Sequence, residues 1–273
     1  MAEMRGGGAG GRMRGILFSL AIMLLGTSLL AMAIFLSGQP SKASRASSWL
    51  LDMDRASHTR ANIDDALAGL VSRSINFSVE NGTLGIEASL PWDSRIGEDI
   101  SKFELFEENY SDANADMDLQ RIRNGSFKVM PVNASVEQSG GNFSIVPQDG
   151  SGVAGYYLMI SFPEGGFDNV TWAPSNGSGD LMPVYVRLQG GEGQPYYIYQ
   201  GIDRNGESIL SIGDDGGFAG QVRFHPPSAL ELLYVGNIGL KASVGFTSQV
   251  YVETEDMVSI SHSANQSRRV RVA

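Results

Sequence analysis

The sequence predicts a mainly β protein in which an N-terminal transmembrane helix continues into an amphipathic stalk helix, followed by a β-sandwich-like extracellular head. An uncharged apolar run of 21 residues extends from Ile16 to Leu36. Apolar residues then recur at helical spacing to about Arg73, and the pattern changes to period two after Ser74. The predicted parts are a basic cytoplasmic leader (1–15), a transmembrane helix (16–37), a helical stalk (38–73) and a glycosylated β-rich head (74–273).

Composition limits the classes of protein to which the chain can belong. It has 273 residues, no cysteine and a formal net charge of −10, which suits one medium domain or two small ones. Residues 1–15 hold three arginines and one glutamate, so the remainder carries a net charge of −12 and would repel nucleic acid. The absence of cysteine excludes disulfides, thiolate metal sites and cysteine nucleophiles, and it favours a prokaryotic surface protein.

The apolar run is long enough to cross a membrane, because a helix rising about 1.5 Å per residue spans the roughly 30 Å hydrocarbon core in 20 residues. The alternative, a secretory signal peptide, has a shorter apolar region and a small-x-small cleavage site, which "SGQPSKAS" matches only weakly. The arginine-rich leader predicts a single-pass protein of the cell membrane, with lipid as a partner, the N-terminus in the cytoplasm and residues after Ser37 outside. Ser19, Gly26 and Ala33 lie seven apart, a stripe typical of helices that pack closely in lipid, although small residues are common in any spanning helix.

Asparagine-linked glycosylation motifs are far more numerous than chance predicts. Nine of the 13 asparagines begin an Asn-x-Ser/Thr triplet without proline, where the serine and threonine content would give roughly two. All nine lie on the side of the membrane that the charge rule places outside, and the excess predicts an N-glycosylated, exported domain. The acceptors are Asn76, Asn81, Asn109, Asn124, Asn133, Asn142, Asn169, Asn176 and Asn265.

Helical periodicity continues beyond the membrane segment. The helix is expected to run nearly unbroken from Ile16 to about Arg73, with a kink at Gln39-Pro40, because proline removes a backbone donor. The residues that recur at steps of four and three are Trp49, Met53, Ala56, Ile63, Leu67 and Leu70.

The rest of the chain has the alternation of β-strands. "INFSVENGTLGIEASL" predicts a hairpin whose turn, Asn81-Gly82, is the pair favoured in a type I′ turn. The segment 98–123 is the exception, expected to be a loop or short helix. Further strands are expected in "GSFKVMPVNASV", "NFSIVP", "GYYLMISF", "MPVYVRLQ", "PYYIYQGI", "ESILSIG", "GQVRFH", "LLYVG", "LKASVGF", "QVYVETE", "MVSISHS" and "RRVRVA".

Motifs for catalysis are absent from the sequence, which contains no HExxH, GxSxG or Walker pattern. We therefore expect no enzyme activity, no cofactor and no metal site. His58, His225 and His262 lack the spacing of metal ligands. Asp214 and Asp215 in "GDDGG" lack the spacing of a calcium loop, which favours a turn.

An aromatic cluster has two interpretations. Aromatic rings offer flat apolar faces with polar tips, so the cluster is one candidate platform for stacking sugars. Core packing on one strand face, with ordinary exposure on the other, is the favoured interpretation. Its members are Tyr156, Tyr157, Tyr196, Tyr197, Tyr199 and Trp172.

The N-terminal pattern of Arg14-Gly15 followed by the apolar Ile16, a hydrophobic segment and a stalk resembles that of archaeal type IV pilin-like surface proteins, with a class III signal peptide-like N-terminus. The resemblance implies that a prepilin-type peptidase cuts between Gly15 and Ile16, and that the freed helices pack into a filament core. Because the head is larger than in typical major pilins, the resemblance implies a minor, tip or accessory subunit. Its partners would be other pilin-like subunits or the cell-surface layer.

Two functional hypotheses remain open from sequence. The first is a structural or adhesive subunit of a pilus-like assembly. The second is a singly anchored binding protein that keeps its leader and recognises polysaccharide or an extracellular solute. Residues 179–264 contain no acceptor triplet, so part of this stretch is expected either to pack against a neighbouring subunit or to supply mainly core strands.

Overall fold

A computed structural model gives the architecture of the chain, which divides into two compact units, Met1–Arg55 and Ala56–Ala273. For parts of the helix α1 and of the C-terminal strands, only the backbone is described. The structure describes residues 9–110, 114–148, 152–163, 166–175, 177, 179–190, 193–214, 217–261 and 265–269.

The N-terminal helix α1 runs from Ala9 to Val71. It begins inside the predicted leader, continues through Pro40 and ends two residues before the expected end at Arg73. The expected long helix is therefore present in the backbone.

Among the described residues, no helix combines the length and the hydropathy needed to cross a membrane. Most side chains of residues 16–37 lie outside the described set, so the membrane segment stays a prediction. Seven large apolar side chains that are described in this part of α1 are 59–75% exposed: Met23, Leu24, Leu25, Leu29, Leu30, Met32 and Ile34.

The second unit is mainly β and contains a six-stranded and an eight-stranded sheet. In the six-stranded sheet all neighbours are antiparallel except β7 and β9, which are parallel. Its strands, in spatial order, are β1 (Ile75–Glu80), β2 (Thr83–Leu90), β14 (Ile238–Phe246), β7 (Val153–Phe162), β9 (Leu181–Gly190) and β10 (Tyr196–Asp203).

The eight-stranded sheet is antiparallel throughout. Its strands, in spatial order, are β15 (Tyr251–Glu253), β4 (Ser126–Met130), β5 (Ala134–Ser139), β6 (Asn142–Pro147), β13 (Ala229–Tyr234), β12 (Gly217–His225), β11 (Ser208–Asp214) and β8 (Asn169–Ala173).

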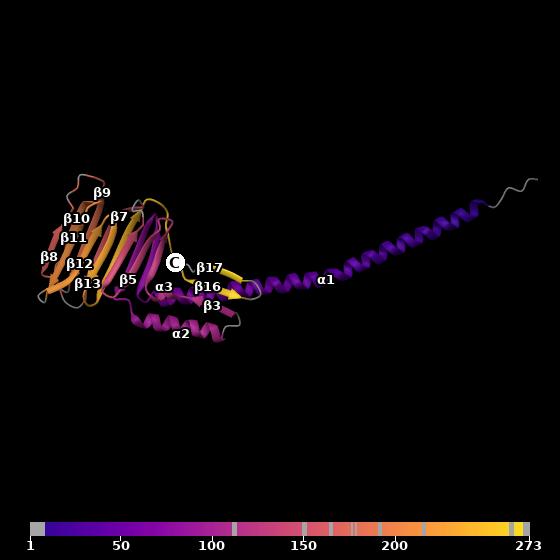
Figure 1. The fold of residues 1–273 in the computed structure, drawn as a ribbon, viewed down its shortest axis with the longest axis horizontal. Helices are drawn as coiled ribbons and strands as arrows, with labels where there is room; N and C mark the ends of the chain where they lie inside the picture. The colour runs from indigo at the N-terminus through magenta and orange to yellow at the C-terminus, as the bar shows by residue number, and fades with distance from the viewer. Residues whose placement is uncertain are drawn as a thin grey trace, which may run out of the picture. The chain divides into compact units, whose positions relative to one another are not determined.

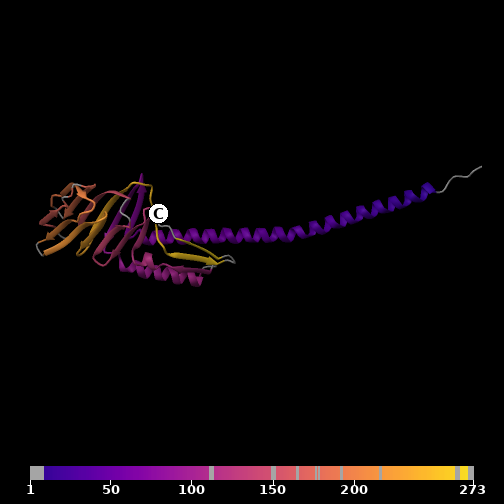
Figure 2. The same ribbon diagram turned by 45° about the horizontal axis from the view of Figure 1, so that its top comes forward.

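A third, three-stranded sheet lies at one end of the β-rich unit, beside the helix α2 (Figures 1 and 2). The helix α3 precedes β4 in the chain and contacts it. These elements are β17 (Asn265–Arg269), β16 (Met257–Ser261), β3 (Asn114–Asp118), α2 (Ser94–Tyr110) and α3 (Gln120–Arg123).

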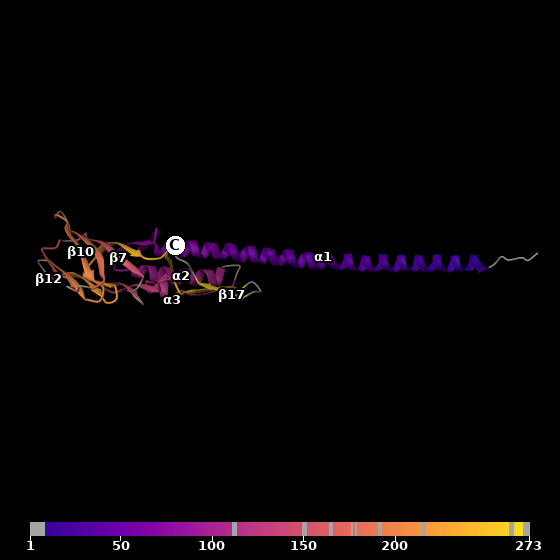
Figure 3. The same ribbon diagram turned by 90° about the horizontal axis from the view of Figure 1, so that it is seen from above.

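The two large sheets pack face to face over one hydrophobic core, and Figure 3 shows β10 and β12 in separate layers. Aromatic rings join the sheets in two places. The centroids of Phe77 and Phe127 are 5.0 Å apart, and those of Tyr156 and Phe224 are 5.7 Å apart. The last turns of α1 belong to this core, because Leu67 is fully buried in it.

Polar groups also connect the two sheets. Tyr156 donates a hydrogen bond of 2.6 Å from its hydroxyl to the carbonyl oxygen of Ser228, in the turn between β12 and β13. Arg204 follows β10 and donates from Nη1 to the Ser228 hydroxyl at 2.7 Å and to the carbonyl of Val153 at 2.5 Å. Nε of Arg204 contacts Asp180 at 2.9 Å. Buried polar groups of this kind stabilise a fold only when their partners are present.

The predicted hairpin from residue 75 to residue 90 is confirmed. Glu80 pairs with Thr83 across the turn, and Asn81 and Gly82 have φ angles of 49° and 77°. A type I′ turn requires two consecutive positive φ angles, which asparagine and glycine adopt most readily. The local sequence therefore determines both the turn and the register of β1 and β2.

The segment 98–123 was predicted incompletely from sequence. It contains most of α2 and all of α3, as the expectation of a short helix allows, but it also contains the strand β3. The strand β8 was not predicted. The stretch 125–136 is not one strand, because it contains β4, the start of β5 and the turn between them, in which Asn133 has a φ of 51°. β3 pairs only with β16, so its structure depends on residues more than 130 positions later.

Candidate functional site

The predicted processing and packing residues lie in α1, where the structure describes only their backbone. Arg14, Gly15 and Ile16 are helical, and their side chains lie outside the described residues. The same holds for the predicted packing stripe of Ser19, Gly26 and Ala33. Both hypotheses therefore stay predictions.

The nine predicted glycosylation sites all belong to the second unit, eight of them between residues 76 and 176 of the sequence. Asn76, Asn81, Asn109, Asn124 and Asn169 are exposed, as an acceptor side chain must be. Asn133 is half-buried, and its side-chain nitrogen donates to the side-chain oxygen of Gln148. Asn142 is also half-buried. Asn176 and the side chain of Asn265 lie outside the described residues.

Each of the three sheets has an edge strand that carries one of these acceptors. Asn76 lies in β1, Asn169 in β8 and Asn265 in β17, and within the described ranges each of these strands has a neighbour on one side only. An exposed edge offers unpaired backbone groups to other chains, so proteins commonly protect it. A bulky glycan at these positions would obstruct the addition of a further strand.

Asn142 is the acceptor that the fold presents least well. It lies in β6, which has neighbours on both sides, and its Nδ2 donates to Oε1 of Glu231 at 3.0 Å. Its Oδ1 is buried and has no hydrogen-bond partner among the described residues. The nitrogen that would carry a glycan is thus occupied in the folded state.

Most of the stretch without acceptor triplets, residues 179–264, forms strands with neighbours on both sides. β9, β11, β12, β13, β14 and β16 are internal to their sheets, whereas β10 and β15 are edges. The expectation that the stretch supplies core strands therefore accounts for most of it. The hypothesis of contact with a neighbouring subunit is left with the edge strands β10 and β15 and with the exposed face beside β10.

The histidines and the aspartate pair do not form a common site in the described part of the chain. His58 is exposed on α1, and His225 on β12 lies 3.2 Å from Oε2 of Glu231. Asp214 ends β11, while Asp215 and His262 lie outside the described residues. Within the described ranges, no group of three or more histidine or acidic side chains could hold a metal ion.

An exposed row of tyrosines is the most distinctive surface of the described head. Tyr157 on β7, Tyr185 on β9 and Tyr199 on β10 are direct cross-strand neighbours. The rings of Tyr157 and Tyr185 are stacked, with centroids 4.5 Å apart and planes 5° apart. Tyr157 is 42% exposed and Tyr199 is 80% exposed. The outer surface of the six-stranded sheet thus presents several flat rings, and we call this surface the tyrosine face.

Arg187 forms the next row of the tyrosine face. It lies directly opposite Tyr197 on β10, and its guanidinium carbon is 5.7 Å from the centre of that ring, within the range of a cation–π contact. Arg187 donates from Nη2 to Gln189 at 3.3 Å, and its buried Nε has no partner among the described residues. Desolvation by the surrounding side chains raises the pKa of Tyr185 above its ordinary value.

The predicted aromatic cluster is divided between the core and the surface. Tyr156 is buried, and Trp172 is half-buried with its Nε1 donating to Gln200 at 2.8 Å. Tyr157, Tyr197 and Tyr199 lie on the tyrosine face, while Tyr196 is exposed at the start of β10. Tyr185 and Arg187 were not predicted as members of the cluster. The register between β7 and β9, which the sequence does not reveal, brings them to the other tyrosines.

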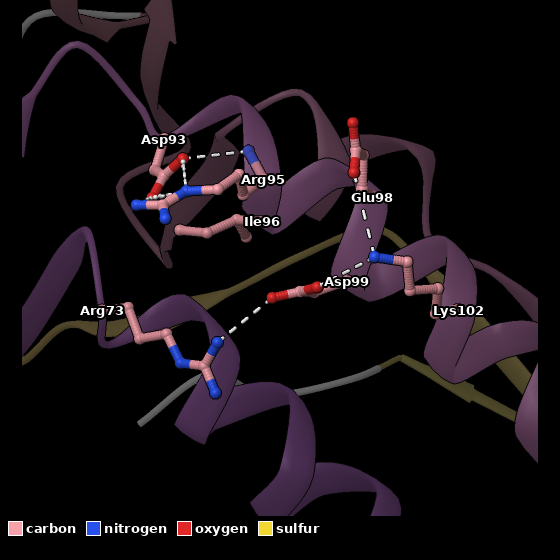
Figure 4. Close-up of a pocket in the computed structure, with 7 residues that line it drawn as sticks. All are labelled: Arg73, Asp93, Arg95, Ile96, Glu98, Asp99 and Lys102. Atoms are coloured by element: carbon pink, nitrogen blue, oxygen red, sulfur yellow. Dashed lines mark hydrogen bonds and ion pairs between the residues drawn. The ribbon is translucent and has the colours of Figure 1, made fainter.

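A surface hollow of about 400 Å³ lies between the end of α1 and the start of α2 (Figure 4). Asp93 accepts from the Arg95 side chain and from its backbone N–H, and these bonds lower the pKa of Asp93. Asp99 contacts Arg73 at 3.1 Å and Lys102 at 3.6 Å. Because its charges are already paired with one another, this hollow is best explained as a surface ion-pair cluster that joins α2 to α1.

In comparisons with known proteins, no protein-family model, no curated protein and no solved structure matches this chain.

Proposed function

We propose that the chain is a membrane-anchored, N-glycosylated cell-surface protein that serves as a minor or accessory pilin-like subunit with a structural or adhesive role. Residues 16–37 would form the anchor and packing helix, and the two-sheet unit would be a β-sandwich head outside the cell. The observation that carries the proposal is the row of seven large apolar side chains, between Met23 and Ile34, that α1 leaves exposed.

Such a helix surface needs lipid or other apolar helices around it. Contiguous exposed apolar surface on a soluble protein marks a site of membrane or protein contact. Thr27 and Ser28 are the polar side chains described between these positions, and the hydroxyl of Thr27 donates back to the carbonyls of Met23 and Leu24 at 3.0 Å each. The hydroxyl of Thr27 is therefore satisfied within the helix, which is the condition for placing it in lipid.

The resemblance of the N-terminus supplies the rest of the proposal. A prepilin-type peptidase would cut between Gly15 and Ile16, and Arg14 would contribute to recognition of the site. The freed helix would pack against other pilin-like subunits through the stripe that contains Gly26. The excess of arginine over acidic residues in the leader supports a cytoplasmic N-terminus.

Mass spectrometry of the native N-terminus tests this proposal. The protein would be isolated from its own membranes and deglycosylated before measurement. We expect a mature chain that begins at Ile16 and co-purifies with filaments. A chain that begins at Met1 or Ala2 would contradict the pilin-like assignment, although it would leave a membrane anchor in place.

The tyrosine face favours a second candidate function, a singly anchored protein that binds polysaccharide or an extracellular solute. Stacked and tilted rings with polar tips are suited to the apolar faces and hydroxyl edges of sugars. This alternative predicts a retained leader, a monomer in mild detergent and polysaccharide binding that Tyr199→Ala reduces. A filament-associated protein with no polysaccharide affinity would contradict it.

A further inference from the structure

A shallow hollow of about 180 Å³ lies on the same surface as the tyrosine face, over β1, β2 and β14. Its floor is a cross-strand row of three small residues, Ser78, Gly85 and Ser243. A Cβ at Gly85 would lie 2.3 Å from Oγ of Ser78, so glycine keeps this part of the floor low. The hollow therefore depends on the small residues at these positions as well as on the course of the strands.

The ring of Tyr157 stands at one end of this row. Ser243 is the direct cross-strand neighbour of Tyr157 on β14. Because the rings of Tyr157 and Tyr185 are parallel and stacked, Tyr157 turns one ring face to Tyr185 and the other toward Ser243 and the hollow. The ring does not line the hollow itself, but its register with Ser243, which does, places an aromatic face beside the hollow at this end.

Polar groups line one side of the hollow. Nζ of Lys241 lies 2.7 Å from Oε1 of Glu87, and both side chains are more than half exposed. The ammonium has three donor hydrogens and the carboxylate several acceptor positions, so both retain capacity for further hydrogen bonds. An apolar ring face beside exposed donors, acceptors and serine hydroxyls is the chemistry that recognises a pyranose sugar.

Asn76 lies at the opposite end of the hollow from Tyr157. It is the direct neighbour of Glu87, it is exposed on the same surface, and it begins the acceptor triplet Asn76-Phe77-Ser78. Three inter-strand steps separate β1 from β7, which is about 14 Å at the usual spacing of about 4.8 Å between strands. A glycan of a few sugars can cross this distance along the floor.

We propose that the glycan attached to Asn76 folds back over β2 and β14 and stacks a sugar ring on the free face of Tyr157. Attachment at the rim gives the sugar a high effective concentration at the hollow, so weak contacts are sufficient to hold it there. The bound glycan covers a surface of the six-stranded sheet that the chain leaves open. This inference rests on the export and glycosylation that are part of the proposed function.

Tyrosine nitration followed by peptide mass spectrometry tests the inference on full-length protein from its native membranes. Asn76→Gln and Ser78→Ala both remove the acceptor, whereas Ser78→Thr keeps it and is the matched control. We expect nitration of Tyr157 to rise several-fold in Asn76→Gln and in Ser78→Ala, and to stay at the native level in Ser78→Thr. Nitration of Tyr199, which lies beyond Tyr185, should be equal in all four proteins.

The outcomes separate this inference from the proposed function. If glycopeptide analysis finds a glycan on Asn76 and the nitration of Tyr157 is the same with and without it, the inference is wrong and the proposed function stands. Continued protection of Tyr157 in Asn76→Gln would show a different occupant, such as an external polysaccharide, and would also overturn it. A native protein that carries no glycan at any acceptor overturns both proposals.

Discussion

The Tyr156 hydroxyl is one of the polar groups that connect the two large sheets. It is buried and donates to the carbonyl of Ser228, so Tyr156→Phe leaves that carbonyl without its partner. We expect the free energy of unfolding to fall by about 1–3 kcal/mol, the usual cost of an unsatisfied buried group. Urea denaturation of the purified protein measures it.

The matched control for this change is Tyr199→Phe, which removes the same hydroxyl from an exposed ring. Exposed substitutions away from special features change stability by about 0.5 kcal/mol or less. An equal loss of stability in both variants would contradict the role assigned to Tyr156.

The same buried tyrosine gives the head a pH dependence in alkaline solution. Burial raises the pKa of Tyr156 above its ordinary value, and burial also raises the pKa of Tyr234. As the pH rises above about 10, the unfolded chain loses these protons while the folded chain keeps them. Stability is therefore fully present below that pH and lost above it. Urea midpoints between pH 8 and 11 should fall less steeply in Tyr156→Phe than in the native protein.

The sequence could predict the position of some tyrosines of the tyrosine face but not of others. Tyr197 and Tyr199 could be placed on one strand face because alternation along a strand is local. Tyr185 could not be joined to them, because its neighbour Tyr157 lies on a parallel strand 28 residues earlier. No local signal determines that register.

At the scale of elements, the end of α1 is part of the head rather than a detached stalk. Leu67 is fully buried in the core that both sheets share. Leu67→Ala should lower the free energy of unfolding of the head by about 2–5 kcal/mol, the range for removing a buried leucine side chain. Thermal or urea denaturation, followed by near-ultraviolet circular dichroism, would measure the loss.

The control for this element is Leu51→Ala in the same helix, since Leu51 is exposed. It should leave the stability of the head nearly unchanged. A small effect of Leu67→Ala, close to that of Leu51→Ala, would show that the helix end contributes little to the core.

Two strands show why the prediction of elements succeeded in one place and failed in another. β1 and β2 carry clear alternation and an Asn-Gly turn, so every signal that forms the hairpin lies within 16 residues. β3 reads Asn-Ala-Asp-Met-Asp, a sequence poor in strand-forming residues, and only its pairing with β16 makes it a strand. Tertiary pairing overrides local preference in such segments.

At the scale of the whole molecule, the buried hydrophobic core of the described residues begins at Ile63 and lies entirely in the second unit. A chain of residues 56–273 should therefore fold with a urea midpoint close to that of the full protein. It should also remain monodisperse without detergent, because the exposed apolar side chains of residues 23–34 are gone. Size-exclusion chromatography with light scattering checks the second expectation. Aggregation of a well-folded shortened chain would contradict the assignment of the membrane contact to α1.

The half-buried Asn142 has a consequence for the timing of the proposed glycosylation. Its Nδ2 is bound to Glu231, a residue 89 positions later in the chain. A modifying enzyme that meets the folded head finds this nitrogen occupied, whereas one that meets the emerging chain finds it open. The fraction of molecules with a glycan on Asn142, compared with that on the exposed Asn81, therefore records whether sugars are attached before or after β6 and β13 pair.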